Sequence, residues 1–206
     1  MSLSHAGTDV VNSWALARYR ERDLGRGDDP REHVMTVKRD EGFTLIELLI
    51  VVAIISIIAA ISVPGLLRAR MTGNEVSALA SLKVVNSSEV AYSASCGNNG
   101  FAIAFTVLGT PPPGTTVPFI SPDLGVAAPQ KSGYNYTMAA GAGAGVGPLD
   151  CNGTATQSAY YATAAPMTFG TTGSKAYATN AGNTVWQVSA AAAPTEPFGA
   201  PATPIQ

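Results

Sequence analysis

The chain has 206 residues, enough for one ordinary domain with further elements, and a formal net charge of −2. This low and balanced charge excludes a protein that binds nucleic acid through bulk positive charge. Seven of the twelve Lys/Arg residues and eight of the fourteen Asp/Glu residues precede Phe43, so a polar N-terminal segment is joined to a nearly uncharged body.

Residues 1–42 make up this polar segment, and we predict no stable fold for residues 1–34. No hydrophobic periodicity is evident there, and charged side chains crowd its second half. Both histidines, His5 and His33, lie in the segment. The body therefore contains no histidine, which excludes Ser-His and Cys-His nucleophile pairs and histidine metal sites from it.

A membrane segment follows at residues 48–67, which carry no charge. As a helix these residues would extend about 30 Å, the thickness of the hydrocarbon core of a bilayer. An ordinary secretory signal has its cleavage site after the apolar stretch, whereas here the sequence KRDEG-FTLIELL stands before it. Lys38 and Arg39 flank one end and Arg68 and Arg70 the other, so charge alone does not orient the segment.

The residues from Gly42 to Glu47, GFTLIE, followed by the apolar segment, resemble the prepilin-type signal of type IV pilins and type II secretion pseudopilins. The resemblance covers Lys38 to Arg70 and includes Pro64, where the family usually has a proline. It implies that prepilin peptidase, a membrane aspartyl peptidase, cuts between Gly42 and Phe43. It also implies N-methylation of the new amino terminus at Phe43.

Each position in this signal has its own chemical reason. Gly42 lacks a Cβ atom, so its backbone can enter a peptidase cleft closely. Cleavage would give Phe43 a positively charged amine, and Glu47 is the first acid after it. A carboxylate in a membrane helix usually marks function, and the resemblance implies pairing of Glu47 with the Phe43 amine of a neighbouring subunit during assembly. The alternative is that Glu47 snorkels to the membrane interface.

The leader of 42 residues is long for this family, and Met35 opens a short one, MTVKRDEG. We therefore expect translation to begin at Met35, with residues 1–34 as upstream codons read in frame. A real extended leader is the alternative.

Pro64 and Gly65 interrupt the expected helix. Proline removes one helical hydrogen bond and clashes with the preceding turn, so we expect the helix to kink or locally melt there. The resemblance implies that this region becomes extended in a filament. A simple kink where the helix leaves the membrane is the alternative.

We predict one helix of about fifty residues. Residues 43–67 form its transmembrane or fibre-core half, and residues 68–96 form its amphipathic half. Apolar side chains recur every three residues in the second half: Val76, Leu79, Leu82 and Val85. Gly97, followed by two asparagines, is a helix stop signal.

The two cysteines, Cys96 and Cys151, both follow the membrane segment and so share a compartment. They form no CxxC motif and have no neighbouring histidine, which removes support for zinc or thioredoxin-like chemistry. A disulfide is expected if that compartment is the periplasm or the cell exterior. Two buried free thiols are the alternative.

The remaining residues predict a small head. Residues 97–132 contain PPPGTTVP and SPDLG and are interpreted as an irregular αβ-loop. Residues 133–189 contain short alternating runs with a hairpin turn at Asn180 to Asn183, which predict a small antiparallel sheet that covers Val76, Leu79 and Leu82. Residues 190–206 are rich in Ala and Pro and are interpreted as a flexible tail. The predicted fold class is α+β, with the C-terminal half of the helix packed on the sheet.

The sequence shows no sign of catalysis. Acids after residue 47 are scattered and form neither a paired motif nor a calcium loop, and GAGAGVG at residues 141–147 lacks the spacing of a phosphate loop. We therefore predict no catalytic residue, no metal, no cofactor and no enzyme activity.

The resemblance implies a structural subunit of a type IV pilus-like filament that serves adhesion, twitching motility or DNA uptake. Its expected partners are copies of itself, other pilins, prepilin peptidase and the inner-membrane pilus assembly platform. It would be a single-pass inner-membrane protein with its head in the periplasm before assembly, and part of an extracellular pilus afterwards. A type II secretion pseudopilin or a minor pilin is the alternative.

Overall fold

The computed structural model describes residues 42–205. The predictions for the leader before Gly42, including a start at Met35 and the two histidines His5 and His33, lie outside the described residues.

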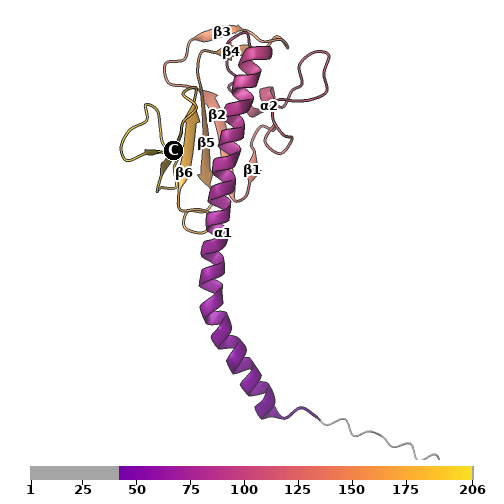
Figure 1. The fold of residues 1–206 in the computed structure, drawn as a ribbon, viewed down its shortest axis with the longest axis vertical. Coiled ribbons are helices and arrows are strands. Elements are labelled where there is room, and N and C mark those ends of the chain that lie inside the picture. Colours follow the sequence, from indigo (N-terminus) through magenta and orange to yellow (C-terminus); the bar gives the residue numbers. More distant parts are fainter. Residues whose placement is uncertain (1–41, 206) are drawn as a thin grey trace, which may run out of the picture. The chain divides into compact units, whose positions relative to one another are not determined.

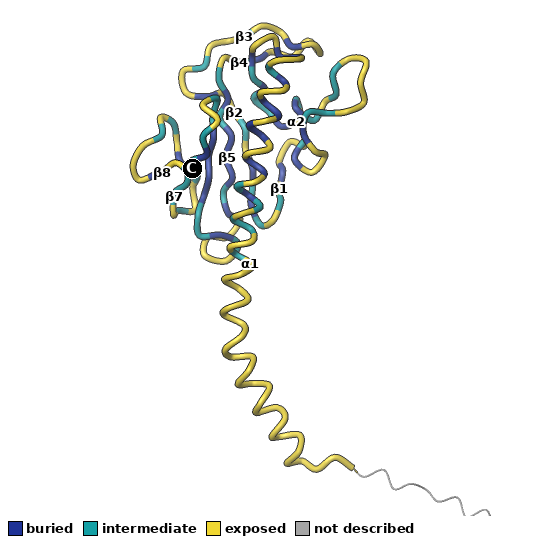
Figure 2. The backbone as a smooth tube through the Cα atoms, in the orientation of Figure 1, coloured by how far each residue is buried: buried dark blue, intermediate teal, exposed yellow. Residues whose placement is uncertain are grey.

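Helix α1 runs from Leu45 to Ser95, 51 residues, and confirms the predicted single long helix. Every residue from 42 to 70 is exposed, whereas buried positions begin at Ala78 (Figure 2). In the described part of the chain, α1 alone is long and apolar enough to cross a membrane. The two halves of the helix therefore have different surroundings, as their composition predicts.

Helix α1 stays α-helical through Pro64 and Gly65. The helix curves in its exposed half, where Pro64 lies, but it is not interrupted (Figure 1). The local melting that we gave as one possibility is absent from this isolated chain. Extension of the region in a filament concerns another state and stays a prediction.

The second half of α1 packs against a six-stranded antiparallel sheet with the order β1-β2-β5-β6-β7-β8 (Figure 1). The six strands are β1 Gln130–Lys131, β2 Tyr134–Ala140, β5 Tyr160–Pro166, β6 Ala176–Asn180, β7 Val185–Val188 and β8 Thr203–Ile205. A short helix and a separate hairpin complete the fold: α2 Phe105–Leu108, β3 Val146–Leu149 and β4 Ala155–Gln157. We call residues 71–205 the head.

The core of the head lies between α1 and the sheet. Leu82 and Val85 of α1 are fully buried there, together with large tyrosine and small alanine side chains of β2 and β5. Alternation along β5 buries Tyr160, Ala162 and Ala164, which follows from the two-residue period of a strand. The α+β class is confirmed. Inclusion of Val76 in this core was wrong, because its side chain is 62% exposed.

Residues 190–206 were predicted as a flexible tail, but the described part of this segment is folded onto the sheet. Strand β8 pairs with β7, and Phe198 stacks on Trp186 with 5.3 Å between ring centroids. The Tyr161 hydroxyl donates a hydrogen bond to the carbonyl of Pro194. The Phe198 ring thus supplies an apolar contact that the small Ala and Pro side chains of this segment do not provide.

The αβ-loop is also more regular than we predicted, because it contains α2 and ends in β1. Polar side chains of α1 hold this loop: the Ser88 hydroxyl donates to the carbonyl of Phe119 at 2.8 Å. The ring of Phe119 packs edge-on against Tyr92. The β3–β4 hairpin was missed altogether, since its glycine-rich sequence has no strand signal.

Candidate processing and assembly site

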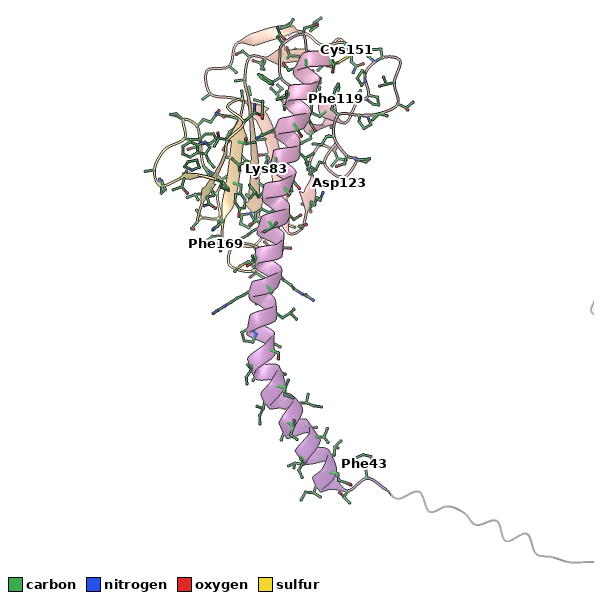
Figure 3. All side chains as sticks on the ribbon, viewed as in Figure 1. Phe43, Lys83, Phe119, Asp123, Cys151 and Phe169 are labelled. Carbon is green, nitrogen blue, oxygen red and sulfur yellow. A yellow bond between two sulfur atoms is a disulfide. The ribbon has the colours of Figure 1, made fainter. Side chains whose placement is uncertain are left out.

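Gly42 and Phe43 precede α1 in the sequence and are both exposed. Figure 3 labels Phe43. A Cβ atom added at Gly42 would meet no heavy atom within 4 Å, so packing against the described residues does not require glycine here. The Phe43 side chain is 83% exposed. Within residues 42–205, neither Gly42 nor Phe43 is covered.

Helix α1 begins with a capping box between Thr44 and Glu47. The Thr44 backbone N–H and hydroxyl donate to Oε2 of Glu47 at 2.9 Å and 2.7 Å. In return, the Glu47 N–H donates to the Thr44 hydroxyl at 3.3 Å. These bonds satisfy backbone donors that the first turn of a helix leaves unpaired.

This local role of Glu47 was missed from the sequence, although Thr-x-x-Glu before an apolar run is a recognised capping signal. A negative side chain in the first turn is also favoured by the helix dipole. An ionised carboxylate has about four acceptor sites, so the bonds from Thr44 leave Glu47 capacity for a further donor. Glu47 lies in the exposed first turn of α1, four residues after Phe43 in the sequence.

A continuous apolar surface follows this end. The large apolar side chains of the exposed half of α1 are about half exposed or more, as Ile50 with 51% and Ile61 with 76% illustrate. A patch of this size on a protein surface marks contact with lipid or with another protein. The sequence predicted this surface correctly from its length and lack of charge.

Cys96 and Cys151 form a disulfide, with 4.8 Å between their Cα atoms (Figure 3 labels Cys151). The bond joins the end of α1 to the turn between β3 and β4. Two further contacts hold the same turn: the Cys151 N–H donates to the Cys96 carbonyl at 2.9 Å, and the Tyr92 hydroxyl donates to Oδ2 of Asp150 at 2.8 Å. The predicted disulfide is confirmed, and the free-thiol alternative was wrong.

Glu89 is a second functional candidate that sequence reasoning did not single out. Its side chain is fully buried between α1 and the αβ-loop, and Oε2 accepts the Ala102 N–H at 3.1 Å. No described residue donates to Oε1. Burial raises the pKa of Glu89 to about 8, against the smaller lowering effect of the Ala102 hydrogen bond. The folded head therefore favours the protonated acid.

No group of three or more His, Cys, Asp or Glu side chains with the geometry of a metal site occurs among residues 42–205. The acids that the sequence shows as scattered form no such group in this part of the chain. Asp123 pairs with Lys131 at 2.7 Å on the surface, whereas Glu75 accepts hydrogen bonds from Ser174.

Comparison with known proteins adds two findings. Residues 37–63 match the family model of the prokaryotic N-terminal methylation motif. The type IV wide pilus major component PilA4 of Thermus thermophilus is 56% identical to the chain over 39 residues. This stretch is 19% of the chain and spans only 30% of the relative. No solved structure is significantly similar to the chain. Both matches are confined to the amino-terminal part of the chain, which is similar there to the methylation motif and to the start of a type IV pilin.

Proposed function

We propose that the chain is a structural subunit of a type IV pilus-like filament, made as a membrane-anchored precursor and assembled through α1. The observation that carries the proposal is a wholly exposed apolar helix half, most of which lies within the matched methylation motif. Such a surface needs lipid or other apolar helices around it. A membrane and then a filament core would provide these surroundings in succession.

The first step would be cleavage between Gly42 and Phe43 by prepilin peptidase, followed by N-methylation of Phe43. The open surroundings of Gly42 support this step, because no residue that the structure describes lies close enough to explain a glycine there. Cleavage leaves Thr44 and Glu47 in place, so the capping box that starts α1 does not depend on the leader. The mature chain would therefore keep a well-formed helix start.

The second step would be assembly. The new amine on Phe43 is positively charged at neutral pH, and an unpaired charge in an apolar filament core is costly. The Glu47 carboxylate of a neighbouring subunit would neutralise it. Because Thr44 already orients that carboxylate within its own chain, the acceptor is positioned before the two subunits meet.

The head would remain outside the membrane, and the filament would display it. We infer a single-pass inner-membrane stage with the head in the periplasm, then an extracellular pilus used in adhesion, twitching motility or DNA uptake. The partners are copies of the chain, other pilins, prepilin peptidase and the inner-membrane assembly platform. The pilin-like family consists of structural subunits, which supports the prediction that the chain is not an enzyme.

Electron microscopy of sheared surface filaments, combined with peptide mapping of their main component, tests this function. The proposal predicts that peptides from residues 71–205 dominate the map and that deletion of the chain abolishes the filaments. Filaments that persist without the chain would contradict it and would favour the type II secretion pseudopilin or minor pilin alternative.

A further inference from the structure

One end of the head carries exposed apolar side chains beside the point where the exposed half of α1 emerges. Met167 and Phe169 lie in the loop between β5 and β6 and are 50% and 48% exposed. Figure 3 places Phe169 at this end of the head. Isolated exposed apolar residues need no explanation, but this loop has a defined structure and a fixed place along α1.

The loop is held to α1 by hydrogen bonds. The Asn74 side chain donates to the Thr172 carbonyl at 3.0 Å, and Oε1 of Glu75 accepts the N–H and the hydroxyl of Ser174, both at 2.7 Å. The loop also closes on itself, since the Gly170 N–H donates to the Gly173 carbonyl at 2.9 Å. These hydrogen bonds fix the position of the loop along α1, which we call its height.

That height matches the surface of a bilayer. Asn74 follows Leu67, the last residue of the uncharged run, by seven residues, which correspond to about 10 Å of helix. The headgroup layer on each side of a bilayer is roughly 5–8 Å thick. With the uncharged run spanning the hydrocarbon core, the loop backbone lies just beyond the headgroups, and Phe169 is exposed at that level.

The charges at this end fit an anionic surface. Arg68 and Arg70 are exposed on α1, and the half-buried Lys175 is the last residue of the loop. Glu75 is the only acid in residues 68–75 and 167–175, and its carboxylate accepts two hydrogen bonds from Ser174. Aromatic and basic side chains together are typical of residues at a membrane interface, and basic side chains near anionic lipids strengthen binding.

We propose that residues 167–175, together with Arg68 and Arg70, dock on the anionic lipid surface of the membrane while α1 spans it. The inference rests on the proposed membrane-anchored stage. Docking would hold the head at a fixed height and orientation before the subunit enters a filament. Withdrawal of α1 from the membrane would then release a surface that is covered only in the membrane-anchored state.

The test uses the mature chain, residues 43–206, in nanodiscs of phosphatidylcholine with phosphatidylglycerol. Lipids with a headgroup-attached nitroxide broaden nearby amide NMR signals. We expect strong broadening at residues 167–170 and none at Val146, an 83% exposed residue of β3 at the other end of the head. Substitution of both Met167→Ser and Phe169→Ser should reduce the loop broadening to the Val146 level, whereas Val146→Ser should leave it unchanged.

Lipids with a tail-attached nitroxide separate this inference from the function on which it rests. Broadened Ile54 and Ile55 signals would show that α1 is inserted. Inserted helices without loop broadening would overturn the docking inference alone, whereas helices that do not insert would overturn the membrane-anchored stage as well. Loop broadening that is equal in pure phosphatidylcholine would overturn the assignment to an anionic surface. If the loop is covered only in nanodiscs that hold two chains, the partner of this surface would be a second copy of the chain and not the lipid.

Discussion

Thr44 and Glu47 hold each other at the start of α1, with the Thr44 hydroxyl 2.7 Å from Oε2 of Glu47 and the Glu47 N–H donating back to that hydroxyl. The carboxylate proposed to pair with the amine of another subunit thus already has a partner in its own chain. Loss of assembly after removal of Glu47 could then reflect a weakened helix start or a missing intersubunit pair. These two causes predict different filament yields when Thr44 is substituted.

We predict that Thr44→Val weakens the helix start by about 1 kcal/mol but leaves filament yield close to normal. Glu47→Gln should abolish filaments, because glutamine is compatible with a capping box yet carries no charge for the amine. The measurement is the fraction of the chain recovered in sheared filaments. Thr44→Ser, which keeps the hydroxyl, is the control. Normal filament yield in Glu47→Gln together with a loss in Thr44→Val would show that capping is the only role of Glu47.

Glu89 predicts an unusual dependence of head stability on pH. Because burial raises its pKa to about 8 in the folded chain, the folded state holds a proton that the unfolded state releases near pH 4. The stabilisation from this proton is complete below pH 4 and is lost as the pH rises to about 8. The loss at pH 8 should be on the order of 4 kcal/mol.

Denaturation of the mature chain in detergent micelles, followed by Trp186 fluorescence, measures this effect. Glu89→Gln should flatten the decline between pH 4.5 and 8, since the amide keeps an acceptor for the Ala102 N–H without a titrating proton. Asp123→Asn is the control: the hydrogen bond with Lys131 holds the pKa of Asp123 below its usual range, so its removal should not alter the slope in this window. A wild-type slope that persists in Glu89→Gln would refute the prediction.

The features that could be predicted from the sequence have local signals. The apolar run from Leu48, the stop signal at Gly97 and the alternation in β2 and β5 each depend on neighbouring residues, and the structure agrees with them. The disulfide could be predicted because only two cysteines exist and both follow the membrane segment.

The features that were missed depend on contacts between distant residues. Strand β8 exists because Phe198 reaches Trp186 and β7 offers an edge, and neither is visible in an Ala/Pro-rich composition. Glu89 resembles a surface acid of an amphipathic helix until the αβ-loop is seen to cover it. The capping box at Thr44 is different, since its pattern was present in the sequence and was overlooked.

The disulfide should be the main tether of the β3–β4 hairpin. Substitution of both Cys96→Ser and Cys151→Ser should lower the free energy of unfolding by roughly 4 kcal/mol, because the 55-residue separation gives a long closed loop. Tyr92→Phe, which removes only the hydrogen bond to Asp150, should cost about 1–3 kcal/mol. Denaturant unfolding with the disulfide intact and reduced provides the comparison. An unchanged midpoint in the double serine variant would contradict this prediction.

Pro64 should favour assembly while it lowers the stability of the isolated helix. A proline at this position cannot donate to the Ala60 carbonyl, so Pro64→Ala should stabilise the helix by about 3 kcal/mol and slow amide exchange around it. If the region extends in the filament, the same change should reduce filament yield. Gly65→Ala, for which the structure has room, should have a smaller effect of about 1 kcal/mol. Normal filament yield from Pro64→Ala would mean that assembly needs no loosening here.

The most direct test of the whole account is mass spectrometry of the amino-terminal peptide of the chain recovered from surface filaments. Processing between Gly42 and Phe43 predicts that this peptide begins at Phe43 and carries one additional methyl group on its amine. A chain in filaments that still begins upstream of Phe43 would contradict the account, because the amine proposed to pair with Glu47 would then not exist.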